Sequence, residues 1–407
     1  MEKLKEYAKL IVEVGLNVQK GENVIITSQV STPELVYFVM DEAYEKGARE
    51  VYVQWIDDTV SRKKFFNDDD EIFSDFPKWH EEFYKHYDSK NSNYLNIYSS
   101  DPEALKGVDP NRIMKKSQLT NKHLKDHIGK VMGNEQSWCV VSVPSVAWAK
   151  KIFPNLEKQE AVDKLWDVIF DIVRVGNNQA TNRWENHLEN MLNVNKKLND
   201  YQFDKIRFTS ENGTDLTLGL VKNHIWCGGK EKNKVSGKYF VANMPTEESF
   251  TMPNANDVNG IVYNTKPLSY NGSIIDDFCL TFENGKVVKY SANVGENVLE
   301  SMLETDKGAS YLGEVALVSN DSPISRSDIL FYNTLFDENA SCHLALGRAY
   351  PINIEDYDKL SDDDKKQVGI NYSAIHEDFM IGDSSTKVIG YKGNDEIIIF
   401  DNGNFVL

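Results

Sequence analysis

Short apolar runs alternate with amphipathic stretches through the first half of the chain. Runs typical of strands lie at 23–28, 50–56, 94–99 and 138–144. Segments with apolar residues at helical spacing lie between and after them, including 161–176 and 183–200. Strands separated by helices predict a mainly parallel sheet, so we expect an α/β domain here. In the segment 32–48, Thr32 is expected to cap a helix that has Pro33 at its first position and ends at Gly47.

The pattern changes after about residue 200. Three Asn-Gly pairs, at 212–213, 284–285 and 402–403, each lie between two runs of strand-forming residues. Asn-Gly between alternating strands is a strong hairpin signal, so this half is expected to be mostly antiparallel β with one helix near 295–305. A single core stops growing near ~250–300 residues, and the chain has 407. We therefore expect an α/β domain at 1–200 and a β-rich domain at 201–407.

Composition narrows the class of protein. The net charge of −18 disfavours nucleic-acid binding and favours cationic ligands such as peptide amino termini. No apolar stretch approaches the ~18 residues that span a bilayer, and the amphipathic N-terminus lacks a signal sequence, so a cytoplasmic protein without membrane contact is expected. The four cysteines are far apart in sequence, which predicts buried free thiols and neither a disulfide framework nor a zinc ribbon.

Several common catalytic motifs are absent. The sequence has no G-x-G-x-x-G, no G-x-x-x-x-G-K-[ST], no G-x-S-x-G and no H-E-x-x-H. His123 and His127 have the i, i+4 spacing of two zinc ligands, but Leu124 stands where the base glutamate of that motif would be. The polar surroundings favour an exposed helix over a metal site.

The run AIHEDFMIG at 374–382 is rich in strand formers and carries three ionisable residues in its middle. Alternate side chains of a strand share a face, so His376 and Asp378 are expected to point the same way and Glu377 the other way. A lone pair of this kind is more often a hydrogen-bonded structural pair than a metal site.

Three more candidate ligands lie in apolar segments of the same half. Glu248 lies in NMPTEESF, Glu314 in the β-type run YLGEVALVSN, and His343 in DENASCHLALGRAYP. In the last segment we expect Asn339 to cap a helix, with His343, Gly347 and Tyr350 along one side of it. Glu338 then lies just before the helix, where the positive end of the helix dipole favours a carboxylate.

Taken together, these residues point to a metal centre. Buried carboxylates are costly unless they are paired or bind a cation. Mixed histidine and carboxylate ligands without cysteine suit zinc, cobalt or manganese. Five or six such ligands exceed the three of a mononuclear catalytic zinc and fit two metals about 3.5–4 Å apart.

The phrases NMPTEESFTMP, YLGEVALV, TLFDENASCHLALGRAYP and IHEDFMIG resemble those of the aminopeptidase T / aminopeptidase S family of metalloaminopeptidases. GENVIITS, NGTDLTLGL and WCGGK also resemble family segments, so the likeness runs to about residue 382. It implies an α/β domain, a β-rich, barrel-like domain, and a homodimer with an enclosed active-site chamber. Carried over residue by residue, it implies these metal ligands: Glu248 (rather than Glu247), Glu314, His343, Tyr350, His376 and Asp378.

The resemblance implies hydrolysis of the first peptide bond of peptides with a free N-terminus. Two divalent ions, zinc or cobalt with manganese also compatible, would activate a water. Glu314 is the candidate bridging ligand, Glu338 the candidate general base, and Tyr350 either a weak ligand or a donor to the oxyanion. Two departures from the family pattern, Glu377 and the segment DSSTKV after Gly382, leave these residues unchanged.

Two alternatives stay open at this point. One is another two-metal hydrolase, acting on a different amide or on a phosphoester. The other is a protein of the same fold that binds metal or peptide without catalysis.

Overall fold

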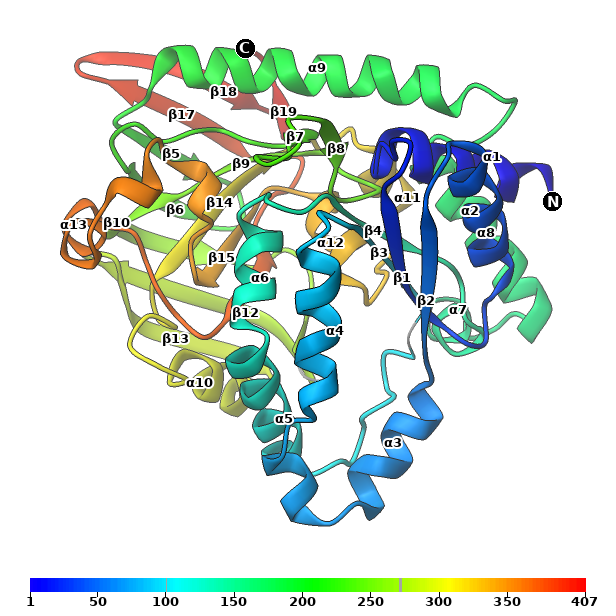
Figure 1. Cartoon of the computed structure of the whole chain (residues 1–407). Helices are drawn as coiled ribbons and strands as arrows, with labels where there is room; N and C mark the ends of the chain where they lie inside the picture. The colour runs from blue at the N-terminus through cyan, green and yellow to red at the C-terminus, as the bar shows by residue number, and fades with distance from the viewer. Residues whose placement is uncertain (100, 271–272) are drawn as a thin grey trace. The chain divides into compact units, whose positions relative to one another are not determined.

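The computed structural model describes residues 1–99, 101–270 and 273–407 (Figure 1). The chain divides into two compact units: a first unit of Met1–His187 with Lys230–Pro245, and a second unit of Leu188–Gly229 with Thr246–Leu407. The hairpin β7–β8 (Lys230–Lys232 and Tyr239–Val241) belongs to the first unit because the segment that follows it pairs with β4, at Val140 and Asn243. A domain boundary at residue 200 remains a prediction.

The first unit is built on a four-stranded parallel sheet. The strand order is β2-β1-β3-β4, with β1 at Asn23–Gln29, β2 at Glu50–Ile56, β3 at Asn93–Tyr98 and β4 at Trp138–Ser142. In Figure 1, α1 and α2 lie on one side of this sheet, and α4 and α6 lie on the other. The α/β domain with a mainly parallel sheet is therefore confirmed.

The helices of the first half follow the amphipathic segments closely. Their bounds are α1 Glu2–Leu10, α2 Glu34–Glu45, α3 Asp58–Asn67, α4 Lys78–Asp88, α5 Pro110–His123, α6 Lys125–Met132, α7 Val146–Ile152, α8 Lys158–Ile172 and α9 Ala180–Tyr201. The expected start of α2 is wrong by one residue. Pro33 is the cap residue rather than the first helical residue, and the Thr32 hydroxyl makes no hydrogen bond.

The two histidines at helical spacing do not share a helix. α5 ends at His123 and α6 begins at Lys125, so the expected single exposed helix is wrong. His123 pairs with Glu81, and Nδ1 of His127 lies 3.0 Å from Oδ1 of Asp88. Both rings thus tie these helices to α4, and neither belongs to a group of potential metal ligands among the residues described.

The second unit is antiparallel and β-rich, as expected. Its larger sheet has the order β11-β12-β10-β6-β5-β17-β18-β19, with β13 paired to β12. The strands are β5 Lys205–Thr209, β6 Asp215–Leu220, β10 Pro253–Tyr263, β11 Leu268–Tyr270, β12 Ser273–Glu283, β13 Lys286–Val294, β17 Lys387–Lys392, β18 Asp395–Asp401 and β19 Asn404–Phe405. The three predicted hairpins form as β5–β6, β12–β13 and β18–β19, and the predicted helix is α10 at Glu296–Leu303.

A second, smaller sheet in this unit carries the candidate site. Its order is β16-β15-β14-β9, and all its pairings are antiparallel. The strands are β9 Glu248–Thr251, β14 Leu312–Val318, β15 His343–Gly347 and β16 His376–Met380. One face, which includes Val315, Leu317, Leu344, Leu346 and Phe379, joins the main hydrophobic core of the unit. That apolar face holds the register of the strands, because a slip of one residue would expose it.

Two further expectations concern the whole chain. All four cysteines are free thiols, as predicted, but only Cys139 and Cys342 are fully buried. Within the described ranges, no helix combines the length and the apolar character needed to cross a lipid bilayer.

Candidate metal centre

Strand register places the candidate ligands on one face of the small sheet. Residues paired directly across neighbouring strands point to the same side. Glu314 of β14 pairs with Ala345 of β15, which in turn pairs with Asp378 of β16. In the same way, the pairing of His343 with Ala316 and of Glu248 with Val318 turns both side chains to this face. Ala345, with its small side chain, thus lies between Glu314 and Asp378 in the sheet.

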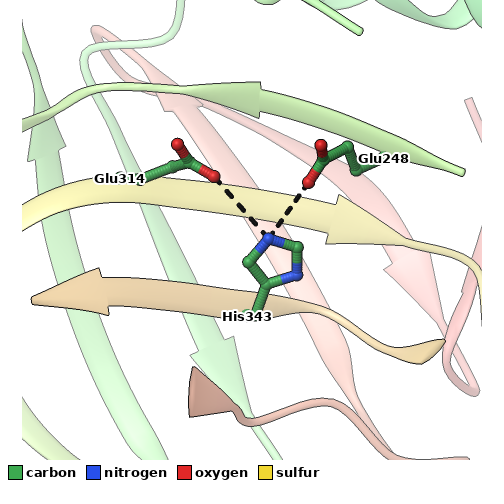
Figure 2. A group of neighbouring side chains, drawn as sticks. All are labelled: Glu248, Glu314 and His343. Atoms are coloured by element: carbon green, nitrogen blue, oxygen red, sulfur yellow. Dashed lines mark ion pairs between the residues drawn. The ribbon is translucent and has the colours of Figure 1, made fainter. Parts of the chain in front are cut away.

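The first group of side chains joins three neighbouring strands. Nε2 of His343 lies 3.1 Å from Oε2 of Glu248 and 3.6 Å from Oε1 of Glu314. Figure 2 shows both carboxylates pointing toward the imidazole ring from their own strands. It is therefore Glu248 whose carboxylate reaches His343, at the position that the family spacing implied.

The second group shares one member with the first. Nε2 of His376 lies 3.6 Å from Oε2 of Glu314 and 3.6 Å from Oδ1 of Asp378. Within each group, one potential ligand atom from each residue lies within 4.8 Å of the others. Glu314 thus directs one carboxylate oxygen to each group, which is the arrangement that a ligand bridging two cations requires.

Both imidazole rings are oriented by backbone carbonyl groups. Nδ1 of His343 lies 3.1 Å from the carbonyl oxygen of Ser341, and Nδ1 of His376 lies 2.6 Å from that of Arg348. A proton on Nδ1 satisfies each carbonyl and leaves Nε2 as the ring atom that faces the carboxylates. Metal-binding histidines in proteins are commonly held in this way.

The carboxylates of the cluster are buried or partly buried, and one of their oxygens has no hydrogen-bond donor within the described part of the chain. Glu248 is 7% exposed and Glu314 is 4% exposed. Burial raises the pKa of Glu314 to about 7, although the bond from His343 lowers it. Oδ1 of Asp378 is buried and has no hydrogen-bond partner among the described residues. An unsatisfied buried carboxylate oxygen is costly unless a cation binds it, so the residues present fit a divalent metal site.

The segment from Glu338 to Tyr350 does not form the expected helix. His343 begins strand β15, and Glu338 begins a 3₁₀ turn at Glu338–Ala340 that directly follows α12 (Thr334–Asp337). Because the apolar run CHLALG is buried on both faces, its pattern does not separate a helix from a strand. Backbone pairing with β14 on one side and with β16 on the other makes it a strand.

Tyr350 and Glu338 both lie beside the cluster. The Tyr350 ring contacts the His376 ring edge-on, with ring centres 4.7 Å apart. Burial raises the pKa of Tyr350 well above its usual value, and the charges of Glu314 and Asp378 raise it further, so its hydroxyl keeps its proton. Burial likewise raises the pKa of Glu338, and the nearby charges of Glu248 and Asp378 add to this effect. Both groups are therefore close enough to the cluster to interact with its charges.

Gly347 is required by the close approach of two strands. It has a φ of +105° and pairs with His376, and a Cβ atom here would collide with the carbonyl oxygen of Ile375. We expect Gly347→Ala to lower the free energy of unfolding by about 1–3 kcal/mol, the cost of a strained backbone position. Denaturant unfolding measures this loss.

The matched control is Gly129→Ala in α6, where the added methyl group meets no described atom within 4 Å beyond those of its chain neighbours and the backbone of its own helix. Alanine is the better helix former, so this variant should be as stable as the wild type or slightly more stable. Equal stability of the two variants would show that β15 and β16 tolerate a side chain at Gly347.

Comparison with known proteins places this chain in a family. The family model described as thermophilic metalloprotease (M29) matches residues 1–405. The chain belongs to the M29 metalloprotease family. Aminopeptidase AmpS of Bacillus subtilis is 42% identical over 99% of this chain and 98% of its own length. Aminopeptidase 2 of Geobacillus stearothermophilus is 41% identical over 99% of this chain and 97% of its own length.

A solved M29 relative has the same fold. Wild-type AmpT from Thermus thermophilus superimposes with a TM-score of 0.93 at 33% identity, covering 100% of this chain and 99% of that one. The resemblance seen in the sequence is therefore confirmed, and so is the expected class of enzyme, a metalloaminopeptidase. A metalloprotease family implies a divalent metal, and the buried carboxylate–histidine cluster fits that requirement.

The sequence interpretation missed the groups that orient the two histidines. The carbonyl groups of Ser341 and Arg348 are backbone atoms, so no side-chain identity could reveal them. Asn339 was expected to cap a helix, but its buried side-chain amide instead contacts Glu338 and the backbone of Glu247. In the sequence, the only feature that pointed to Asn339 was its position next to the candidate base Glu338.

Proposed function

We propose that this M29 protein removes the N-terminal residue from peptides and uses two divalent metal ions to do so. The observation that carries the proposal is the position of Glu314, whose two oxygens face two separate histidine–carboxylate groups. The aminopeptidase names of its relatives support the choice of substrate.

Each group supplies the ligands of one ion in this proposal. Glu248, Glu314 and His343 would hold one ion, and Glu314, His376 and Asp378 would hold the other. Tyr350, against the His376 ring, either completes the second set or donates to the oxyanion of the substrate. Oxygen and imidazole ligands without thiolate suit zinc or cobalt, with manganese also compatible.

When bound, such a pair of ions lowers the pKa of a water toward ~7 and polarises the scissile carbonyl group. Glu338 takes a proton from the attacking water onto a carboxylate oxygen and passes it to the leaving amine. Burial and the charges of Glu248 and Asp378 raise the pKa of Glu338, so this carboxylate holds a proton more readily than an exposed one does. The surplus of carboxylates around the site attracts the protonated α-amino group of a peptide.

Reconstitution with zinc, cobalt or manganese, followed by an assay with two matched peptides, tests this function. The protein should release free leucine from a leucine peptide and none from the same peptide with an acetylated N-terminus. Equal cleavage of both peptides would indicate a hydrolase of another amide. Complete absence of turnover with all three metals, despite two bound ions, would indicate a binding protein.

The affinity for metal is expected to rise with pH through the neutral range. In the metal-free protein the pKa of Glu314 is raised to about 7 by burial. Burial lowers the pKa of His343, but its bonds to Glu248 and Glu314 outweigh that effect and the net pKa is raised. A cation binds only the ionised carboxylate and the neutral imidazole, so protons compete with it below these pKa values.

We therefore expect the apparent affinity for zinc to fall at least about tenfold for each pH unit below ~7, which is the effect of displacing one proton. Competition with a chromophoric chelator at several pH values measures this change. An affinity independent of pH would mean that the cluster is already free of protons before the metal binds.

Two further proposals concern the setting of the enzyme. We propose that it works as a homodimer in the cytoplasm. Four free thiols fit a reducing compartment, and the family resemblance supports the dimer. Light scattering of the purified protein should give a mass close to twice 46.4 kDa, and a mass of one chain would contradict the dimer.

A further inference from the structure

Asn339 is one of the most deeply buried polar side chains in the second unit. It is 0% exposed and lies directly after Glu338, in the turn that Glu338 begins. Its Oδ1 atom accepts a hydrogen bond of 2.7 Å from the backbone N–H of Glu247. Its Nδ2 atom donates to the carbonyl oxygen of Leu335 at 3.0 Å and to Oε1 of Glu338 at 3.3 Å. Every polar atom of this amide therefore has a partner.

These bonds determine the orientation of the amide group, with its oxygen toward Glu247 and its nitrogen toward Glu338. Only a carbonyl oxygen can accept from the N–H of Glu247, and only an amide N–H can donate to both the Leu335 carbonyl and the Glu338 carboxylate. The Nδ2 group therefore faces the candidate base, while Oδ1 faces the residue before the ligand Glu248. One buried side chain thus joins the turn of the base to the start of strand β9.

We propose that Asn339 is a positioning residue that holds Glu338 through Nδ2 and, through the bond of Oδ1 to the N–H of Glu247, the ligand Glu248. This inference rests on the roles proposed above for Glu338 and Glu248. The N–H group fixes one oxygen of the Glu338 carboxylate, which leaves the other oxygen to face the substrate. The oxygen of Asn339 fixes the backbone N–H of Glu247, the residue before Glu248, so that the Glu248 carboxylate stays aligned with His343. Asn339 touches no reacting atom itself.

Two substitutions separate the bonds of Nδ2 from the bond of Oδ1. Asn339→Asp keeps the size and an oxygen for the N–H of Glu247 but removes the N–H donor to Glu338 and to the Leu335 carbonyl. Asn339→Ala removes all three bonds. Each change should be made in the wild type and in Glu338→Gln, with measurement of kcat, KM, zinc affinity by chelator competition, and thermal unfolding. Asn233→Ala is the matched control, since Asn233 is also a buried, fully bonded amide but lies in the first unit.

We expect Asn339→Asp to lower kcat by about 10–100-fold, which corresponds to the loss of one hydrogen bond to a charged group, with KM and zinc affinity little changed. In the Glu338→Gln background it should cause no further loss, because Asn339 acts through that carboxylate. Asn339→Ala should in addition lower zinc affinity by about 10–100-fold, the size of effect expected when a group that positions a metal ligand is removed. Asn233→Ala should lower only the unfolding temperature.

Two results would overturn the inference. The first concerns Asn339→Asp. If it lowered kcat by the same factor in the wild type and in Glu338→Gln, or did not lower it at all, Asn339 would not act through Glu338. The second is an unchanged zinc affinity in Asn339→Ala, which would mean that it does not hold Glu248. Zinc affinity needs no substrate, so this second part stands or falls independently of the proposed peptidase activity.

Discussion

The Glu338→Gln variant is expected to lose about 10²–10⁴-fold in kcat while it keeps both metal ions. The amide has the size of the carboxylate but cannot accept the proton of the attacking water, and general-base catalysis typically contributes a factor of this order. Glu338 belongs to neither group of potential ligands, so the metal content should not change. Steady-state kinetics together with metal analysis of the same preparation tests both parts.

A comparison with His376→Ala distinguishes loss of the general base from loss of the metal. That variant removes a proposed ligand and should lose metal as well as turnover. If Glu338→Gln turned over like the wild type, Glu338 would not be the base. If it lost metal as His376→Ala is expected to do, its carboxylate would be part of the metal centre instead.

The second large effect is expected for Glu314→Gln. This carboxylate faces both ligand groups, and the neutral amide can offer only one oxygen and no negative charge. We expect the metal content to fall below two ions per chain, and kcat to fall at least as far as in Glu338→Gln. The fall in metal affinity should exceed the about 10–100-fold that removal of a ligand's hydrogen-bond partner causes. Titration of the metal-free variant with zinc measures it.

Glu377→Gln is the matched control for this change. Glu377 lies in β16 between His376 and Asp378, and strand alternation turns it away from them. Burial raises the pKa of Glu377 to about 7, so the neutral amide resembles the form that is already well populated near neutral pH. The control should bind two ions and keep its turnover. Two ions bound with unchanged affinity in Glu314→Gln would exclude Glu314 as a bridging ligand.

The raised pKa values of the cluster indicate that a bound metal would stabilise the folded protein. Without a cation, the negative charge of the buried carboxylates is neutralised mainly by bound protons and by the two imidazole rings. Ions that bind the folded chain and not the unfolded chain stabilise it by mass action. Removal of metal should therefore lower the unfolding temperature of this protein, and Glu314→Gln should reduce that difference.

Much of the fold follows from local patterns in the sequence. The run at 50–56 forms β2 with the predicted bounds, and the three Asn-Gly pairs form hairpin turns, because both signals depend on neighbouring residues alone. The pairing of His376 with Asp378 on one face also follows from strand alternation. The family and the set of candidate ligands were accessible from long, specific motifs.

Other features depend on contacts that no local pattern contains. The segment that begins at His343 satisfies helix and strand patterns equally, and only the neighbouring strands β14 and β16 make it a strand. The meeting of Glu248, Glu314 and Asp378 depends on the register of four strands that are distant in sequence, and that register is held by an apolar face buried in the core. The partners of Asn339 likewise come from this packing. The sequence by itself determined which chemical groups this protein has and most of its local structure; tertiary structure alone decided which of those groups meet, because their meeting is set by long-range strand pairing and the burial of a shared core.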